Sequence, residues 1–183
     1  FQELLLGNIL SGRYPAGEIG HFLSHYSIAF PEEYMAVVCI KITPAVSSDG
    51  SSIDYKNHFL WIVSRFEPYA AVYQADILSV YKCLLFNFSR LDSGYSQKIW
   101  QNLEEEIRVY GQKHGLRICL SISRVESSRE SLPAMYQEAC MLLHYRLFHP
   151  EAVAFYPKRQ RNTETRPPVI PLTMIETLYH YFI

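Results

Sequence analysis

Residues 116–156 read LRICLSISRVESSRESLPAMYQEACMLLHYRLFHPEAVAFY, and three secondary-structure elements follow one another in this stretch. Branched and more polar residues alternate over 116–123, a period of two that predicts a strand with one apolar face. A helix is predicted over 131–148, with Ser131 as its cap, because apolar residues recur at three- and four-residue steps. Residues 153–156 predict a second strand, so the stretch indicates a globular domain of mixed helices and strands.

Further elements are predicted upstream of this unit. Residues 34–42, YMAVVCIKI, are apolar throughout, which is typical of a central strand covered on both faces. Ser51 or Ser52 is the expected cap of the helix that follows, and Glu104 and Arg108 on the next helix are expected to form an i,i+4 ion pair. The predicted upstream helices are 1–10, 15–30, 53–66 and 96–113, and the predicted upstream strands are 34–42, 69–73 and 80–88.

The order of these elements predicts an α+β fold. Its middle is a ferredoxin-like β-α-β-β-α-β core, an antiparallel sheet with two crossover helices on one face. One more helix and strand extend this core, as in GGDEF and palm-like domains, and helices precede it. We therefore expect an N-terminal helical linker at 1–30, a regulatory domain at 31–157, and a linker with the start of a helix at 158–183.

Composition limits the classes of function. A chain of 183 residues can bury one sizeable core, and 49% hydrophobic against 19% charged residues is typical of a folded rather than a disordered protein. The formal net charge of −1 gives no basic footprint for nucleic acid. No run reaches the roughly 18 apolar residues of a membrane span, so we expect no membrane contact by this segment.

Four cysteines are spread along the chain with no C-x-x-C spacing, and each lies in an apolar strand or helix. They are Cys39, Cys83, Cys119 and Cys140. This usage predicts reduced core residues of a cytoplasmic protein, with a metal or disulfide role as the less favoured interpretation.

A combination of short sequences carries a resemblance to a known family. A strand ends in Ser-Ile-Ser at 121–123, a Ser-rich loop follows, the string Tyr-Gln-Glu-Ala occurs at 136–139, and the last strand ends in Ala-Phe-Tyr at 154–156. In this order they resemble the regulatory domain that precedes the helix-turn-helix of AraC-type transcription regulators in Gram-positive bacteria. Those domains are degenerate relatives of the GGDEF fold of diguanylate cyclases.

The resemblance implies a non-catalytic domain that relays a signal in a cytoplasmic transcription regulator. Its implied partners are a second copy of itself, an N-terminal sensor or receiver domain, and DNA, which a C-terminal domain outside this sequence would bind. Leu5 and Leu6 in the first helix are expected to lie outside the core and to support self-association. Residues 173–183 begin with a capping box and are expected to form a linker helix.

The residues at the family's catalytic positions argue against an enzyme. A cyclase needs carboxylates at the end of the first strand and in the hairpin to hold metal on a triphosphate. Here the strand ends with Lys41 in CIKITP, and the hairpin reads QADIL, in which Asp76 alone matches. We therefore predict no activity and assign no catalytic, cofactor-binding or metal residue. The alternative is a pseudoenzyme that still senses a nucleotide or cyclic dinucleotide, and an active cyclase ranks third.

Other polar groups receive structural interpretations. His21 and His25 have a spacing that can hold a metal, but no third ligand accompanies them, so we expect a polar helix surface. Glu104, Glu105 and Glu106 are expected to be a solvated helix face. Lys158, Arg159 and Arg161 are expected to belong to a basic linker rather than to contact phosphate.

Overall fold

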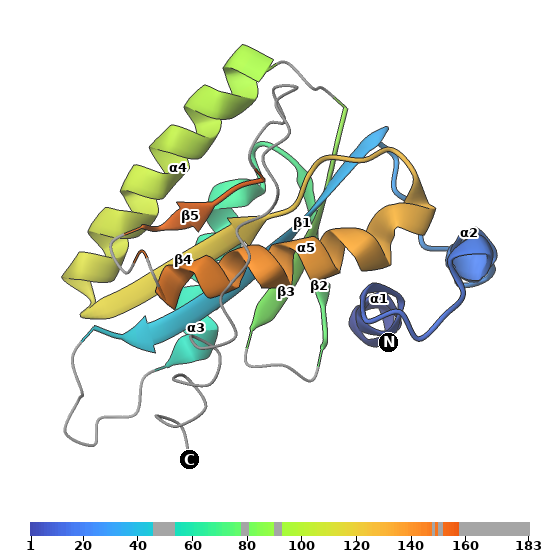
Figure 1. Cartoon of the computed structure of the whole chain (residues 1–183), viewed down its shortest axis with the longest axis horizontal. Coiled ribbons are helices and arrows are strands. Elements are labelled where there is room, and N and C mark those ends of the chain that lie inside the picture. The colour runs from blue at the N-terminus through green and yellow to red at the C-terminus, as the bar shows by residue number, and fades with distance from the viewer. Residues whose placement is uncertain (46–53, 78–80, 90–92, 148, 150–151, 158–183) are drawn as a thin grey trace, which may run out of the picture.

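A five-stranded sheet forms the centre of the protein, which is described here by a computed structural model (Figure 1). The structure describes residues 1–45, 54–77, 81–89, 93–147, 149 and 152–157, and for 93–100 the backbone alone. The strands lie in the order β2-β3-β1-β4-β5. Their bounds are β1 Tyr34–Pro44, β2 Ala71–Ala75, β3 Lys82–Phe88, β4 Leu116–Ile122 and β5 Ala154–Phe155.

Helices cover both faces of this sheet. The α-helices are α1 Gln2–Leu10, α2 Ile19–His25, α3 Tyr55–Phe66, α4 Ser93–Lys113 and α5 Leu132–His144, with 3₁₀ turns η1 Ala16–Glu18, η2 Arg129–Ser131 and η3 Tyr145–Leu147. One hydrophobic cluster joins α3 and α4 to one face of the sheet, and a second joins α1, α2 and α5 to the other. Within the described residues, no helix is long and apolar enough to cross a membrane.

The predicted α+β class is confirmed, but the prediction of an antiparallel sheet is wrong. β1 pairs antiparallel with β3 and β4, and β2 pairs antiparallel with β3, whereas β4 and β5 are parallel. The sheet is therefore mixed. The physical reason is the connection, because α5 crosses the sheet and returns the chain in the same direction, as a crossover helix must.

The central position predicted for the strand at 34–42 is confirmed. Met35 to Ile40 are all buried, and their side chains alternate between the two hydrophobic clusters. Gly115 has a φ of +64° after α4, as expected for the residue that ends a helix in the left-handed region. β1 is thus an apolar strand that both helical layers need.

Several predicted boundaries differ from the structure. α3 begins at Tyr55, and its cap is the Asp54 carboxylate, which accepts from the Asn57 N–H at 3.2 Å, rather than Ser51 or Ser52. Ser131 makes no capping hydrogen bond at α5, which ends at His144 before a 3₁₀ turn. The second helix is shorter than predicted, since a 3₁₀ turn precedes α2 and Tyr26 follows its last residue.

The edge strand and the long helix also start at shifted positions. β2 begins at Ala71 rather than at residue 69, because the N–H groups of Tyr69 and Ala70 still bond to the Phe66 carbonyl and continue the turn after α3. α4 begins at Ser93 rather than at residue 96. The last strand, β5, is confined to Ala154–Phe155.

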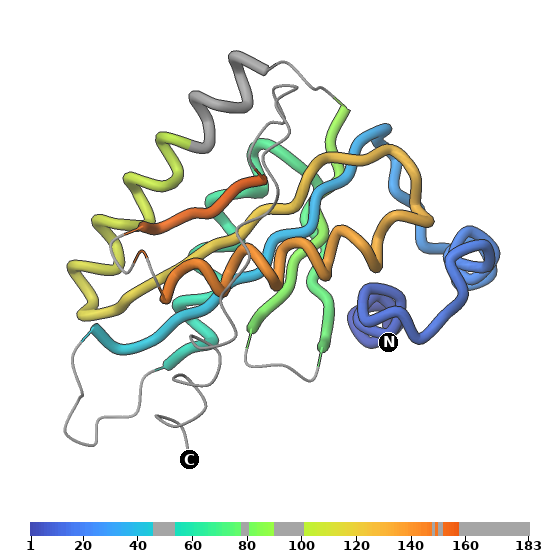
Figure 2. The backbone as a smooth tube through the Cα atoms, viewed as in Figure 1, coloured from blue at the N-terminus to red at the C-terminus, as the bar shows by residue number. Residues whose placement is uncertain are grey.

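The N-terminal helix belongs to the core, which contradicts the expectation that Leu5 and Leu6 lie outside it. Leu5 is 3% exposed and Leu6 is 0% exposed, and both join the cluster that contains α5 and β1. Figure 2 shows α1 beside β2 and α5, on the same side of the sheet as α2. The apolar positions of α1 alone could not reveal which of them face a partner within the chain.

We expect Leu6→Ala to destabilise the protein by about 3 kcal/mol, because the substitution removes a fully buried side chain and leaves a cavity. Urea unfolding followed by circular dichroism measures the loss. Met141→Ala is the matched control, since Met141 lies in α5 but is 63% exposed, and its effect should stay within about 0.5 kcal/mol. The expectation would be contradicted if Leu6→Ala were as stable as the unmodified protein and had a smaller mass in light scattering. Leu6 would then support self-association rather than the core.

Candidate functional site

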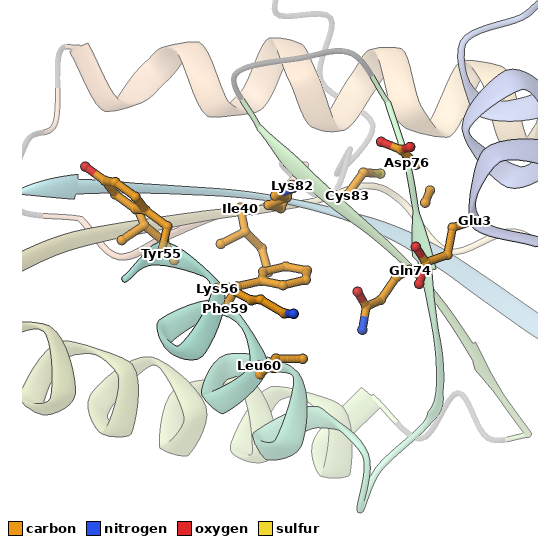
Figure 3. A pocket seen from close by; sticks show the side chains of 12 residues that line it. Glu3, Ile40, Tyr55, Lys56, Phe59, Leu60, Gln74, Asp76, Lys82 and Cys83 are labelled. Atoms are coloured by element: carbon orange, nitrogen blue, oxygen red, sulfur yellow. The ribbon is translucent and has the colours of Figure 1, made fainter. Parts of the chain in front are cut away.

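A cavity of about 710 Å³ opens on the α3 side of the sheet (Figure 3). Its volume lies within the range of small-molecule sites. α3 forms one wall, and the ends of β2 and β3 with the first turn of α1 form the other. The lining residues are Glu3, Ile40, Ile42, Tyr55, Lys56, Phe59, Leu60, Gln74, Ala75, Asp76, Lys82 and Cys83.

Local structure explains why these side chains meet. Ile40 lies opposite Lys82 in the antiparallel β1–β3 pair, so both residues lie on the α3 face of the sheet. The α3 lining residues are spaced by one and four positions, which places them along one side of the helix. The Asp54 cap fixes the start of α3 and therefore the position of Tyr55 and Lys56 at the mouth.

The cavity has an apolar interior and a charged rim. Phe59 is buried against the sheet, while Tyr55 is 45% exposed and can present its ring to a ligand. Lys56 and Lys82 supply two positive charges, and Glu3 and Asp76 supply two negative charges. Such a site can stack a planar group and bind a ligand that carries charges of either sign.

α1 is attached to this rim through the backbone. The Asp76 N–H donates to the Glu3 carbonyl at 2.8 Å, directly after the last residue of β2. Gly7 also approaches this place so closely that a Cβ added to it would lie 1.8 Å from the Asp76 carbonyl oxygen. The N-terminal helix is therefore in direct backbone contact with the hairpin that carries Asp76.

The two residues compared with cyclase positions do not share a site. Asp76 lines the cavity, whereas Lys41 points to the α5 face, where its Nζ lies 5.3 Å from the centroid of the Tyr81 ring. Burial lowers the pKa of Lys41, and the nearby charge of Arg146 lowers it further. The cavity wall contributed by β1 consists of Ile40 and Ile42.

The histidine pair forms a polar helix surface. The rings of His21 and His25 on α2 stack with centroids 6.3 Å apart, and the ring of His25 meets Tyr26 edge-on. Both histidines are exposed. Within the described ranges, no three His, Cys, Asp or Glu side chains come together as a metal site.

The expected Glu104–Arg108 ion pair is wrong. Arg108 instead forms a two-bond ion pair with Glu105, one turn earlier at i,i+3, with its Nη2 2.6 Å from Oε1. Glu104 accepts a short hydrogen bond from the Tyr156 hydroxyl beyond β5, and burial raises the pKa of that tyrosine. The acidic run is thus only partly a solvated face. Lys158, Arg159, Arg161 and residues 173–183 lie outside the described residues.

The four cysteines are free thiols, as predicted, but the fold brings three of them together. Cys39 lies opposite Cys83 in the β1–β3 pair, and its Sγ lies 3.9 Å from that of Cys140 on α5. The contact with Cys39 and burial raise the pKa of the Cys140 thiol, which disfavours the reactive thiolate. This arrangement is typical of core packing.

The sequence singled out neither Asn87, which anchors the start of β1 away from the cavity, nor the polar residues that line the cavity. Asn87 is fully buried at the end of β3, and its polarity inside an otherwise apolar strand was the available signal. Glu3, Tyr55 and Lys56 carried no signal, since each is a common residue on a helix surface. Searches against protein families, curated proteins and solved structures find no match for this chain.

Proposed function

We propose that this chain is a non-catalytic regulatory domain that relays a signal within a cytoplasmic, AraC-type bacterial transcription regulator. The contact of α1 with the rim of the cavity carries this proposal. Because Asp76 and Glu3 are joined through their backbones, a displacement of α1 must move the end of β2 and reshape the cavity. The proposal requires that this contact have two arrangements, between which a signal from upstream selects.

The arrangement of strands supports the family relationship. The order β2-β3-β1-β4, with antiparallel pairs throughout, is what a ferredoxin-like core requires, and α5 with β5 corresponds to the helix and strand that GGDEF-like domains add. We propose this topology and, with it, a degenerate GGDEF-like domain. DNA binding would then belong to a further domain of the regulator, and sensing to a sensor or receiver domain.

Self-association of the domain is a part of the proposal. Apolar side chains remain exposed on the N-terminal helices, where Phe1 is 79%, Leu4 52% and Tyr26 43% exposed. The rings of Phe1 and Tyr26 meet with centroids 4.9 Å apart, so they form one surface. These residues replace Leu5 and Leu6 as the ones through which two copies would meet.

We still predict that the protein has no enzymatic activity, and the chemistry of the cavity is the reason. Metal-assisted phosphoryl transfer needs carboxylates that hold the cation against the phosphates. The carboxylates that line the cavity, Glu3 and Asp76, come from α1 and the hairpin, and β1 contributes isoleucines where the chemistry needs an acid.

The cavity itself favours a second candidate function, a pseudoenzyme that senses a nucleotide or cyclic dinucleotide. The exposed Tyr55 ring could stack on a base, and Lys56 and Lys82 could neutralise phosphate. This ligand would act without metal, as an effector that holds α1 and the hairpin in one arrangement.

Titration calorimetry with GTP plus magnesium, and separately with cyclic di-GMP, distinguishes the two functions. For the relay module we expect no heat at high micromolar concentrations of either nucleotide. Saturable heat would instead support the ligand sensor. In that case Tyr55→Ala and Lys56→Ala should each weaken binding about tenfold, because each removes a contact worth roughly 1.4 kcal/mol. Lys113→Ala, an exposed change at the end of α4, is the matched control and should leave the affinity unchanged.

A further inference from the structure

Three cationic side chains converge on the sheet face opposite the cavity, and we call them the cation group: Lys41, Arg117 and Arg146. Antiparallel partners share a face of the sheet, so the pairs Lys41–Cys119 and Thr43–Arg117 place Lys41 and Arg117 on the α5 side. α5 covers Cys39 on this face but ends at His144. The next turn, η3, follows directly after α5 and carries Arg146.

Arg146 has an unsatisfied donor within this group. Its Nε is buried and makes no hydrogen bond. A guanidinium offers five N–H donors in a planar fork, and a buried donor without an acceptor costs free energy. The charge of Arg146 acts on Lys41, and the charges of Arg146, Arg117 and Lys41 all act on the Cys119 thiol, although burial raises the pKa of that thiol overall.

The cation group lacks a protein counter-charge in the part of the chain that the structure describes. There, ion pairs form at Arg108 and Arg124, and neither lies in the group. The C-terminal end of α5 supplies only about half of a negative charge, which offsets a fraction of one cation. Two or more positive charges therefore remain together on a partly buried surface, which is unfavourable unless an anion joins them.

We infer that the cation group binds a phosphate-type oxyanion, either free phosphate or a phosphate monoester. The planar fork of Arg146 suits two oxygens of a tetrahedral anion, and Lys41 supplies a point charge beside it. Arg117 lies at the exposed edge and adds attraction. No residue of the cation group lines the cavity, and Lys41 lies on the sheet face opposite Ile40, Ile42 and Lys82.

Thermal unfolding with inorganic phosphate, against sodium chloride at equal ionic strength, tests the site. A few millimolar phosphate should raise the Tm by about 3 °C beyond chloride. Lys41→Met should weaken phosphate binding about tenfold and, without phosphate, raise the Tm, because it removes a repelled cation. Arg146→Lys keeps the positive charge but loses the planar guanidinium, so this variant should also bind phosphate more weakly. Lys113→Met, an exposed change at the end of α4 that lines neither the cavity nor the cation group, is the matched control and should respond as the unmodified protein does.

Two further comparisons decide whether the cation group binds phosphate and which kind of anion it takes. Equal effects of phosphate and chloride, or an undiminished phosphate response in both Lys41→Met and Arg146→Lys, would overturn the inference. AMP distinguishes the two sources of the anion, since a monoester site binds AMP at least as tightly as phosphate, and a free-ion site excludes it. AMP binding that is lost in Tyr55→Ala but kept in Lys41→Met would belong to the cavity and count against the cation group.

Discussion

Gly7→Ala is expected to destabilise the protein by about 4 kcal/mol or more, a large part of the stability of a domain of this size. A Cβ at residue 7 would lie 1.8 Å from the Asp76 carbonyl oxygen and 2.6 Å from its carbonyl carbon. Both obstacles are backbone atoms of the sheet edge, so no side chain can rotate away. α1 would have to move off β2, which would break the bond from the Asp76 N–H to the Glu3 carbonyl and open the packing of Leu6.

The sign of this effect is opposite to that of helix propensity. Alanine in the middle of a helix is ordinarily more favourable than glycine by roughly 0.5–1 kcal/mol. Gly20→Ala is therefore a sharp control, since a Cβ at Gly20 within α2 meets nothing within 4 Å, and a small gain in stability is expected. Urea midpoints of the two variants measure the contrast. Equal midpoints would show that α1 does not sit against β2 as the structure has it.

Asn87→Asp should cost about 3–5 kcal/mol at neutral pH, because it places an uncompensated charge in a fully buried position. The Asn87 amide donates to the carbonyls of Glu32 and Tyr34 at 2.8 and 2.9 Å and accepts from the Glu32 N–H at 2.9 Å. In Asn87→Asp, the carboxylate can still accept from the Glu32 N–H. Its other oxygen replaces the amide NH2 group and faces the carbonyl oxygens of Glu32 and Tyr34, which it repels.

The loss should depend on pH in a defined direction. Burial raises the pKa of the new carboxyl in the folded state above its unfolded value of about 3.9, so the folded state holds its proton to higher pH. The destabilisation is then smallest below about pH 4 and grows as pH rises through the folded-state pKa. Unfolding of Asn87→Asp at pH 4.5 and 7 measures this change. Asn102→Asp, exposed on α4, is the control, and similar stability of the two variants at pH 7 would refute the expectation.

Patterns of neighbouring residues predicted the helices and strands better than they predicted which of these elements pack or pair with one another. The apolar strand at the centre, the left-handed Gly115 and the alternation in β4 follow from rules that involve a few neighbouring residues. The cap of α3 is Asp54, two or three positions after the expected serines. This is a small error in the position of the cap, and the capping rule itself holds. The parallel pairing of β5 required knowledge of which face α5 crosses.

The candidate sites depend on long-range contacts, and the sequence held little that could predict them. The cavity combines side chains from α1, β1, α3, β2 and β3, and none of these segments has unusual chemistry by itself. Lys41 and Arg146 lie more than a hundred residues apart, and the charge of Arg146 acts on Lys41 because β1 is central and α5 ends early. Gly7 was a readable signal, since glycine inside an apolar helix has a conformational cost that a close approach can offset.

The central place of β1 has a consequence for synthesis on the ribosome. The first strand to pair with β1 is β3, which is complete once Phe88 has been synthesised. The second is β4, which is complete about 30 residues later. At roughly 5–20 residues per second, one edge of this apolar strand stays open for a few seconds of translation. An open, apolar strand edge can pair with another chain, so nascent copies made close together on one messenger are at risk of aggregation until β4 emerges.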